Sequence, residues 1–502
     1  YYTEISERKK WYQQSWFITV MSFLLPLLLM LIMCAMLRIY PLGNKTFLRV
    51  DMNGQYVDFL AYLRSVFTSG NNLFYSFSKN LGGEMYSLAA YYLNNPINYL
   101  VCLFPLQDLP KAVSFLIILR IAFCGLTSNL FLRYVGKAGF SSVIFSTAYA
   151  MMTYCMVNAE NYFFIDGVIF LPLVALGIEK IVRGKSIVGY VLSLGAILMI
   201  NFYMGFMICI FSVLYFLYSV LIQNGFHSLV NTKKQWISFF FGSLLSAGLA
   251  AVVLIPVFLQ LSDSPKYIDP SRLNSSESFH LIDLISKNFS GAYNLNEYKF
   301  GLPGIYAGAL VTVLLILYFL NGKIQSKEKW LTFGLLAVFF ISFQNQSLNM
   351  IWHGFSEPNW WPFRNAFIFS FLLISISWQS FLKRDGLTPR MLQICMLIIL
   401  CISIFLAKSG YSYLSSAKIY FEILISGLCL LIFYYWHQNE KINQVKSSNV
   451  IFPVLLLFLV CANLIMNAYS ILKLNIGEAI TLDQYFESTY PSDETTQSIQ
   501  DN

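Results

Sequence analysis

The sequence predicts an all-α polytopic membrane protein with about thirteen transmembrane helices. Of its residues, 57% are hydrophobic and only 12% are charged, and the mean hydropathy is +0.60. Long apolar runs recur along all 502 residues. About twenty residues at a rise of about 1.5 Å cross the roughly 30 Å hydrocarbon core of a bilayer. We therefore expect an integral membrane protein.

Each predicted span is a largely uncharged apolar segment. Several are shorter than a full crossing, so we expect their ends to be wrong by a few residues or the helices to be shielded by protein. The segments are Trp16 to Ile39, Ala112 to Arg133, Phe140 to Val157, Val168 to Ile181, Ser186 to Ile200, Gly205 to Gln223, Trp236 to Leu261, Pro303 to Leu320, Trp330 to Phe343, Ala366 to Phe381, Met391 to Leu406, Ile419 to Trp436 and Val450 to Leu472.

Lys and Arg are concentrated in every second loop, which predicts the orientation because these residues remain on the cytoplasmic side. We expect the N-terminus inside and, with an odd number of spans, the C-terminal tail outside. The residues that carry this pattern are Arg8, Lys9, Lys10, Arg133, Lys137, Arg183, Lys185, Lys233, Lys234, Lys323, Lys327, Lys329, Lys383, Arg384, Arg390, Lys441 and Lys446.

The predicted domain organisation is one membrane domain over residues 1–472. Two long segments, residues 40–111 and 262–302, fall on its outer side. Residues 473–502 are expected to be a polar outer tail and the start of a missing extracellular part, because the chain begins at Tyr1 rather than Met and ends in a polar sequence.

Charge and cysteine content narrow the function classes. The net charge of +8 is explained by the cytoplasmic anchors, so it does not indicate nucleic-acid binding. The nine cysteines lie mostly within apolar spans without metal-type spacing, and we expect buried hydrophobes rather than a disulfide framework. The first apolar stretch is too long for a signal peptide and has no small-residue cleavage site, so it is expected to be an uncleaved span.

The first outer segment contains short apolar stretches, Phe59 to Val66 and Asn94 to Leu106, that are too short to cross and are expected to lie in the interface or dip into protein. Between them lie many aromatic and amide side chains, from Asn71 to Glu84 and from Tyr91 to Pro96. Such groups suit sugar binding, but an interfacial aromatic belt has the same composition, and the belt is the more frequent case.

Asp51 follows the first span by about a dozen residues, in the stretch Leu48 to Tyr56. Acidic residues are almost absent from the predicted spans. A carboxylate just above the bilayer, in the first long loop, is placed where a membrane enzyme can act on a lipid-borne substrate.

Several short motifs occur in a characteristic order. They are Asp51 to Tyr56, Leu73 to Phe77, Ala90 to Tyr92 with Asn95-Pro96, Phe164 to Gly167 with Leu171 to Leu173 and Gly177 to Glu179, and Gly301 to Gly308. In order and spacing they resemble the YfhO family of bacterial membrane proteins, from about the first span to the 360–364 segment. We expect the family's usual extension, a further outer domain and terminal span, to be absent here.

The resemblance implies a GT-C-type glycosyltransferase with its catalytic carboxylate in the first outer loop. Such an enzyme takes a sugar from a polyprenyl-phosphate (undecaprenyl-phosphate) carrier, with inversion, and passes it to a cell-surface glycopolymer. In Gram-positive relatives the acceptor is typically a teichoic or lipoteichoic acid. The resemblance places Asp51 at the position of the candidate base. The chemistry agrees, because an acceptor hydroxyl attacking C1 needs a carboxylate and the departing phosphate needs a cation.

Two arginines are candidates for the donor phosphate. Arg120 lies about nine residues into the second predicted span, and a charge at that depth is a functional-site hypothesis by default. The equally weighted alternative is an internal pair or a snorkelling side chain. Arg364 starts the tenth span at its outer end, where a planar guanidinium could bind a phosphate bidentately. The alternative is an ordinary boundary charge.

Further polar residues are expected near the substrate. Glu160 and Asp166 lie on the second outer turn with no basic residue beside them in the sequence, so they could hold a divalent metal or orient the acceptor. Metal dependence stays open, and no cofactor is certain. Asp58 is the rival base if the loop is helical there. The full substrate-binding set is Gln55, Asp58, Tyr91, Tyr92, Asn94, Glu160, Asp166, His353 and Glu357.

His280 and Asp283, in the second long outer segment, are expected to belong to a solvated surface. Two other function classes remain open. A transporter or flippase of polyprenyl-linked sugars would also carry mid-membrane arginines, but it should show internal repeats, and none is convincing here. A non-catalytic assembly scaffold is the third class. Proteins that load and flip the carrier could be partners of the chain.

Overall fold

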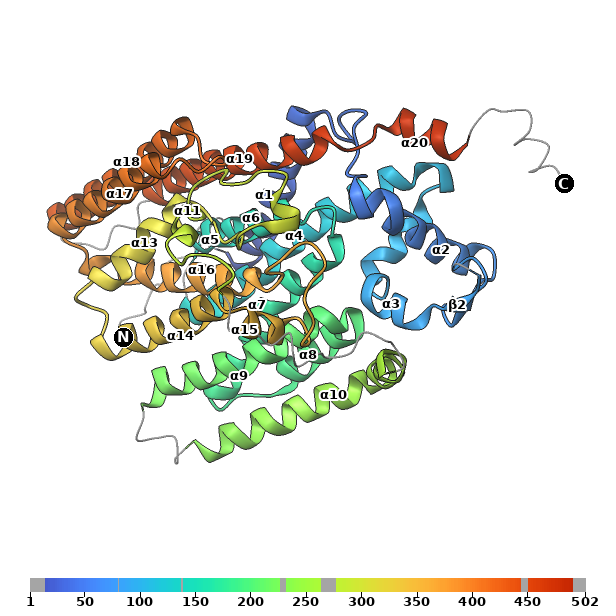
Figure 1. Ribbon diagram of the computed structural model, residues 1–502. Helices are drawn as coiled ribbons and strands as arrows, with labels where there is room; N and C mark the ends of the chain where they lie inside the picture. The colour runs from blue at the N-terminus through green and yellow to red at the C-terminus, as the bar shows by residue number, and fades with distance from the viewer. Residues whose placement is uncertain are drawn as a thin grey trace, which may run out of the picture.

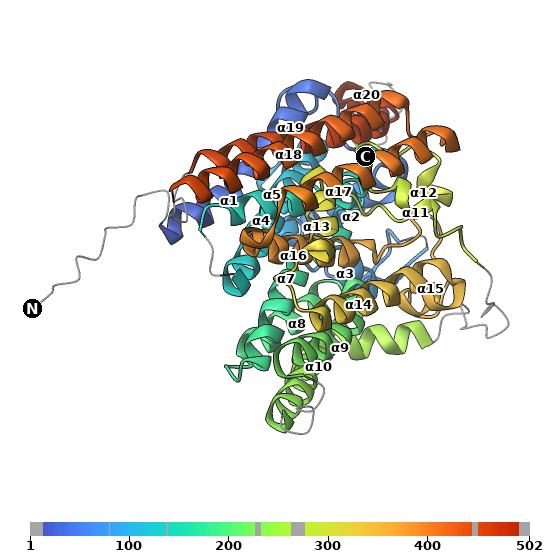
Figure 2. The same cartoon turned by 90° about the vertical axis from the view of Figure 1, so that its left-hand side faces the viewer.

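The computed structural model describes residues 14–79, 81–136, 139–225, 232–262, 277–443 and 450–490. Its fold is a bundle of α-helices with a single two-stranded antiparallel sheet among these residues (Figures 1 and 2). The all-α fold class predicted from hydropathy is confirmed. Five of the basic residues that predict the orientation, Arg8, Lys9, Lys10, Lys137 and Lys446, lie outside the described residues.

Each of the thirteen predicted segments contains helix. They are α1 (Ser15–Leu37), α4 (Leu109–Gly136), α5 (Ser142–Ala150) with α6 (Thr153–Val157), α7 (Tyr162–Val182), α8 (Val188–Ile200), α9 (Phe202–Asn224), α10 (Lys233–Ser262), α13 (Ala309–Leu320), α14 (Ser326–Gln344), α16 (Ala366–Leu382), α17 (Pro389–Ser409), α18 (Ser416–Asn443) and α19 (Ile451–Gly477). Among the described residues, seven helices are long and apolar enough to cross a membrane, namely α1, α4, α9, α10, α17, α18 and α19. A total of thirteen crossings stays a prediction.

The helix ends follow from local sequence. Asn201 accepts a hydrogen bond from the amide of Met204 and so caps α9, and Thr388 does the same for α17, which has Pro389 in its first turn. Gly410 adopts a left-handed conformation at the end of α17, with φ of 68°.

Two predicted spans, the third and the eighth, are interrupted or shortened by non-helical backbone. The third is broken between α5 and α6, and the eighth begins at Ala309 rather than Pro303, because residues 301–308 are not helical. The two irregular segments lie together, since the amide of Thr153 donates to the carbonyl of Tyr306 at 2.9 Å. Non-helical backbone at this depth is tolerated where protein satisfies its polar groups.

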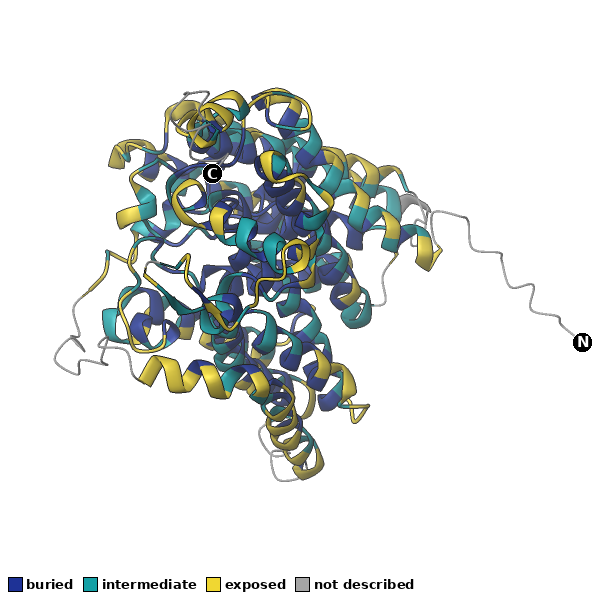
Figure 3. Ribbon diagram, turned by 90° about the vertical axis from the view of Figure 1, so that its right-hand side faces the viewer, coloured by how far each residue is buried: buried dark blue, intermediate teal, exposed yellow. Residues whose placement is uncertain are grey.

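The core lies where α4, α5, α7, α13 and α16 pack together, and α1, α8 and α9 surround them. Buried residues gather in the centre of the bundle and exposed residues lie on its periphery (Figure 3). α10 packs mainly on α8 and exposes many large apolar side chains, as expected for a helix that faces lipid.

The first long connection forms a small subdomain at one end of the bundle, on the right of Figure 1. Its elements are the π-helical turn η2 (Met52–Tyr56), α2 (Val57–Thr68), β1 (Tyr75–Ser76), β2 (Gly83–Glu84), α3 (Tyr86–Tyr92) and the 3₁₀ segments η3 (Pro96–Leu103) and η4 (Leu106–Asp108). The two short apolar stretches singled out in the sequence, Phe59 to Val66 and Asn94 to Leu106, form α2 and η3. The hairpin β1–β2 was not predicted.

The remaining connections are short helical pieces. They are α11 (Asp283–Ser286), α12 (Glu297–Phe300), α15 (Gln346–Trp352), the 3₁₀ turn η7 (Arg384–Gly386) and α20 (Leu482–Thr489). α19 continues to Gly477, five residues beyond the predicted end of the last span. The following segment, 478–490, packs on the first long connection instead of leaving the bundle directly, because Ile480 and Leu482 donate backbone hydrogen bonds to Leu48 and Asn44.

Candidate active site

Asp51 immediately precedes the π-helical turn η2 and is half-buried. Its Oδ2 accepts from the hydroxyl of Tyr56 at 3.2 Å, and its Oδ1 accepts from Nε2 of Gln55 at 3.4 Å. Both donors come from the turn that follows the carboxylate. π-helical turns are rare and often occur at functional sites.

Two residues of the turn between α6 and α7 contact the loop that carries Asp51. Arg49, two residues before Asp51, forms a buried two-pronged ion pair with Glu160, in which Nη2 lies 3.0 Å from Oε1 and Nε donates to Oε2. Next to it, Oδ1 of Asn161 lies 3.2 Å from the hydroxyl of Tyr56. Burial raises the pKa of Glu160, and Arg49 offsets part of that rise. Glu160 therefore holds the loop and does not face an open site.

A cluster of aromatic rings extends from Tyr56 away from Asp51. The ring of Tyr56 lies 5.3 Å from that of Tyr92, which lies 4.5 Å from that of Tyr91, and Phe163 packs against all three. Burial raises the pKa of Tyr92 to about 12, with Arg364 lowering it and Asp51 raising it. Both Asp51 and Arg364 are thus close enough to act electrostatically on the same phenol.

Arg364 lies at the other end of this cluster. Its Nη1 is 3.3 Å from the hydroxyl oxygens of both Tyr91 and Tyr203, and its remaining N–H groups donate to backbone carbonyls at 3.2 to 3.3 Å. Among the described residues it has no carboxylate partner within ion-pair distance. Burial by itself would lower the pKa of Arg364, but the hydroxyl oxygens of Tyr203 and Tyr91 raise it, so the guanidinium stays charged.

The backbone is strained beside both charged groups. Of the six non-glycine residues found at positive φ in the described chain, Val50 precedes Asp51, and four precede Arg364, namely Phe355, Trp360, Trp361 and Phe363. The sixth, Arg38, only caps the end of α1. Bulky residues rarely adopt this conformation, and such strain persists where the surroundings fix it, often at functional sites.

Arg120 makes an internal pair, which is the alternative to donor binding that the sequence left open. It is fully buried, and its Nε donates to Asp166 at 2.8 Å, its Nη2 to Asn98 at 2.7 Å. Asp166 also accepts from Asn95 at 2.6 Å. α7 begins at Tyr162, six residues earlier than predicted, so Asp166 lies inside a buried helix rather than on the turn. No basic residue lies beside Glu160 or Asp166 in the sequence, but the fold pairs each of them with an arginine distant in sequence.

The other predicted residues have varied surroundings. Asp58 is exposed, its pKa is raised by partial burial, and it lies near Tyr485 of α20. Asp58 lies in the first turn of α2, directly after the π-helical turn η2, and its role as the rival base stays a prediction. Asn94 donates to the carbonyl of Met199 at 3.1 Å and so holds the subdomain against α8.

Near Arg364, Glu357 is exposed, whereas His353 is buried with Nδ1 2.7 Å from the carbonyl of Asn349. Burial lowers the pKa of His353 to about 3, so it is neutral near pH 7. Asp283 accepts from the hydroxyl of Tyr411 at 2.5 Å, while His280 is exposed.

Metal-type clusters are absent from the described ranges, since no three His, Cys, Asp or Glu side chains come together there. A cavity of about 30 Å³ lies beside Arg364 and is lined in part by Asn158, Tyr293, Glu297 and Trp361.

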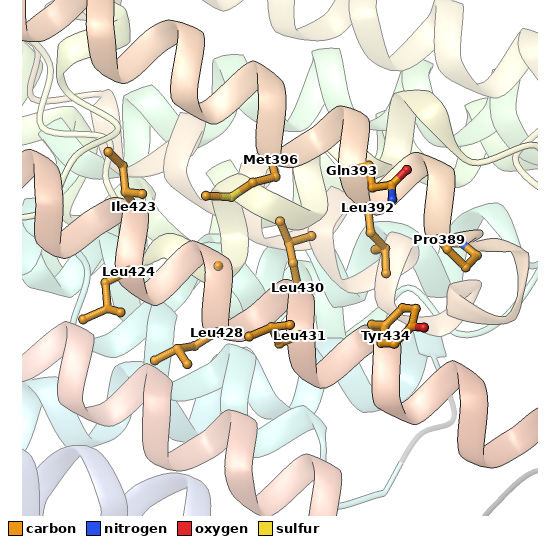
Figure 4. Close-up of a pocket in the computed structure, with 11 residues that line it drawn as sticks. Pro389, Leu392, Gln393, Met396, Ile423, Leu424, Leu428, Leu430, Leu431 and Tyr434 are labelled. Carbon is orange, nitrogen blue, oxygen red and sulfur yellow. The ribbon is translucent and has the colours of Figure 1, made fainter.

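Larger cavities lie elsewhere in the described part of the chain. A groove of about 480 Å³ between α17 and α18 is lined almost wholly by apolar side chains (Figure 4) and holds no charged group. A cavity of about 340 Å³ surrounds Glu179, whose oxygens already accept from its neighbours. These donors are Tyr215, Ser219, Gln223 and Arg183.

Sequence reasoning missed Arg49, Asn161 and Tyr203. Arg49 stands in the same motif as Asp51, but its role depends on Glu160, 111 residues away. In the sequence, Tyr203 is one tyrosine among 32 and stands in no motif singled out above. Only the fold shows that its hydroxyl accepts from Arg364.

The fold and this site define a polytopic α-helical membrane protein with a charged and aromatic site at the end of its bundle where the first long connection lies. More particularly, the chain belongs to the family of bacterial membrane protein YfhO, whose family model matches residues 22–502.

An uncharacterized protein YfhO from Bacillus subtilis (strain 168) is 27% identical over 225 residues, which cover 41% of this chain and 26% of that protein. The match thus spans about a quarter of the length of this curated relative. Among solved structures, ArnT from Cupriavidus metallidurans, crystallised with undecaprenyl phosphate, is similar with a TM-score of 0.44 and 9% identity, over 92% of this chain and 77% of ArnT.

Proposed function

We propose that the protein is a GT-C-type membrane glycosyltransferase that takes a sugar from a polyprenyl-phosphate carrier and passes it to a cell-surface glycopolymer on the outer side of the membrane. A teichoic or lipoteichoic acid is the expected acceptor. The observation that carries the proposal is that a half-buried carboxylate, Asp51, and a cation without a carboxylate partner among the described residues, Arg364, flank one cluster of tyrosine rings.

In the proposed reaction, Asp51 is the general base. An acceptor hydroxyl attacks C1 of the donor sugar from the face opposite the phosphate, and its proton passes to Asp51. The bond between C1 and the phosphate oxygen breaks, and polyprenyl phosphate leaves with the electron pair, so the configuration at C1 is inverted.

Arg364 would bind the phosphate as negative charge develops on it. Its present hydrogen bonds, at 3.2 to 3.3 Å, are all to neutral oxygens. A phosphate oxygen forms shorter and stronger bonds to a guanidinium than a neutral oxygen does. Replacing one of the neutral oxygens bound to Arg364 by a phosphate oxygen is therefore favourable. The rings of Tyr91 and Tyr92 lie between the two charged groups and offer stacking faces for a sugar.

The test replaces Asp51 by Asn and follows transfer of sugar from a polyprenyl-phosphate donor to the isolated polymer. We expect kcat to fall by a factor of about 10² to 10⁴, as for loss of a general base. The matched control is Asp108→Asn, because Asp108 lies in the same connection but pairs with Lys111 on its surface. Unaltered transfer by Asp51→Asn at normal protein level would overturn the proposal, and loss of carrier flipping without loss of transfer would favour a transporter.

The variant Arg364→Lys tests whether Arg364 binds the donor phosphate. A lysine keeps the charge but cannot form the two-pronged contact. We expect a higher KM for the donor together with a lower kcat, whereas an unchanged donor KM would remove Arg364 from the phosphate site.

A further inference from the structure

The segment that follows α19 is bound to the loop that carries Asp51, at the end of the bundle shared by α2 and α20 (Figure 1). Thr46 donates through its hydroxyl to the carbonyl of Ile480 at 2.6 Å, and the amide of Ile480 donates to the carbonyl of Leu48 at 3.0 Å. The side chain of Asn44 donates to Asp483 at 2.5 Å. Residues 44–48 and 480–483 therefore run together as one hydrogen-bonded unit.

Arg49 joins this unit to the rest of the site. Its side chain is 1% exposed and lies between two carboxylates, Glu160 on one side and Glu478 on the other, with Nη1 2.8 Å from Oε2 of Glu478. Glu160 is itself buried, whereas the side chain of Glu478 is 48% exposed. A guanidinium suits this place because its donors form a rigid fork that can serve two carboxylates at once.

The backbone of Arg49 helps to hold the turn that presents Asp51. The carbonyl of Arg49 accepts from the amide of Met52 at 3.0 Å and from that of Asn53 at 3.4 Å, which sets the start of this turn. Val50 stands between Arg49 and Asp51, with φ of 42°. A β-branched residue is strained in this region, and the conformation persists only while its neighbours are held.

We propose that Arg49 and Glu478 are positioning residues for Asp51, and that the segment 478–483, named here the C-terminal strap, completes the active site. The strap holds Arg49, and Arg49 holds Val50 in its strained conformation, so that the carboxylate of Asp51 faces Tyr56 and the tyrosine cluster. This inference rests on the proposed function for its kinetic consequence, but its structural part can be tested without any assay of transfer.

The first experiment is Glu478→Gln in the full chain. Because Glu478 is half-exposed, the change should not unfold the protein. We expect kcat for sugar transfer to fall about tenfold with the donor KM nearly unchanged, since a small displacement of a catalytic group costs rate rather than binding. The matched control is Glu487→Gln in α20, just beyond the strap, where an exposed carboxylate has no ion-pair partner among the described residues.

A second experiment separates positioning from general loosening. Glycine adopts positive φ without strain, so Val50→Gly should partly restore kcat in the Glu478→Gln background. If the C-terminal strap only stabilised the fold, relieving the strain at position 50 would not restore kcat. Absence of any rescue, with both variants folded, would overturn the role assigned to Val50 and Arg49.

The third measurement is hydrogen exchange of the amides of residues 46–56. We expect faster exchange in Glu478→Gln than in Glu487→Gln. If Glu478→Gln changes neither the exchange of these amides nor kcat, the positioning role of the C-terminal strap is wrong, even if Asp51→Asn is inactive. If Asp51→Asn is fully active but exchange still rises in Glu478→Gln, the proposed reaction fails while the strap stands.

Discussion

The hydroxyl of Tyr56 lies 3.2 Å from Oδ2 of Asp51 and the same distance from Oδ1 of Asn161. A phenol has one proton, so it can donate to only one of these acceptors at a time. The amide nitrogen of Asn161 has no partner within the described chain. Turning this amide over would let Asn161 donate to Tyr56 and Tyr56 donate to Asp51, in a short chain that ends at the carboxylate.

Tyr56→Phe tests this chain of hydrogen bonds. The ring would keep its contacts with Tyr92 and Phe163, while Asp51 would lose its donor. One such hydrogen bond contributes about 1 to 2 kcal/mol, so we expect kcat to fall about tenfold in the transfer assay. Tyr149→Phe is the matched control, because it removes a buried phenol bonded to the carbonyl of Val168 at 2.7 Å, away from the site. An equal loss of rate in both variants would contradict a specific role for Tyr56.

The helical architecture could be predicted from the sequence because span formation depends on local composition. α10 shows this most clearly, since its long apolar run is predicted to within three residues of its observed ends. The break between α5 and α6 could not be predicted, because its free amide is satisfied by Tyr306, which is 153 residues later than Thr153.

The candidate site was predicted only in part, for the same physical reason. Asp51 stands out because acidic groups are scarce near the bilayer, and Arg120 stands out because a charge at its depth needs an explanation. Neither observation identifies the residue with which Asp51 or Arg120 interacts. Asp166 is 46 residues from Arg120, and Glu478 is 429 residues from Arg49. Which charges meet is decided by helix packing, so the sequence alone could not tell a donor-binding arginine from a buried pair.

Replacing both members of the Arg120 and Asp166 pair distinguishes a structural role from a catalytic one. Arg120→Met alone leaves a buried carboxylate without its cation, which typically costs about 3 to 5 kcal/mol. We expect a large fall in the thermal unfolding temperature in detergent. The double variant Arg120→Met with Asp166→Leu removes both charges, and we expect it to recover part of this stability.

Activity of the double variant decides the role of Arg120. If Arg120 only pairs with Asp166, Asn98 and the ring of Tyr162, the folded double variant should transfer sugar at close to the wild-type rate. A double variant that is stable but does not transfer sugar would indicate that Arg120 binds the donor. The control Arg183→Met removes a cation whose side chain is 30% exposed, and Glu179 keeps its bonds to Tyr215, Ser219 and Gln223, so we expect it to change stability by less.

His353 predicts how stability depends on pH. Burial lowers its pKa to about 3, against an ordinary value of 6.5. Between these values the unfolded chain binds a proton that the folded chain excludes, so the free energy of unfolding decreases as the pH falls from about 6.5 towards 3, by up to about 1.4 kcal/mol for each pH unit. His353→Gln cannot be protonated, and we expect it to flatten this part of the stability curve when thermal unfolding is followed from pH 7 to pH 4.5. His280→Gln changes an exposed histidine and should leave the slope as it is in the wild type. A slope that His353→Gln does not change would mean that other groups cause the loss of stability in acid, and that His353 is not held neutral by its buried place beside Tyr203.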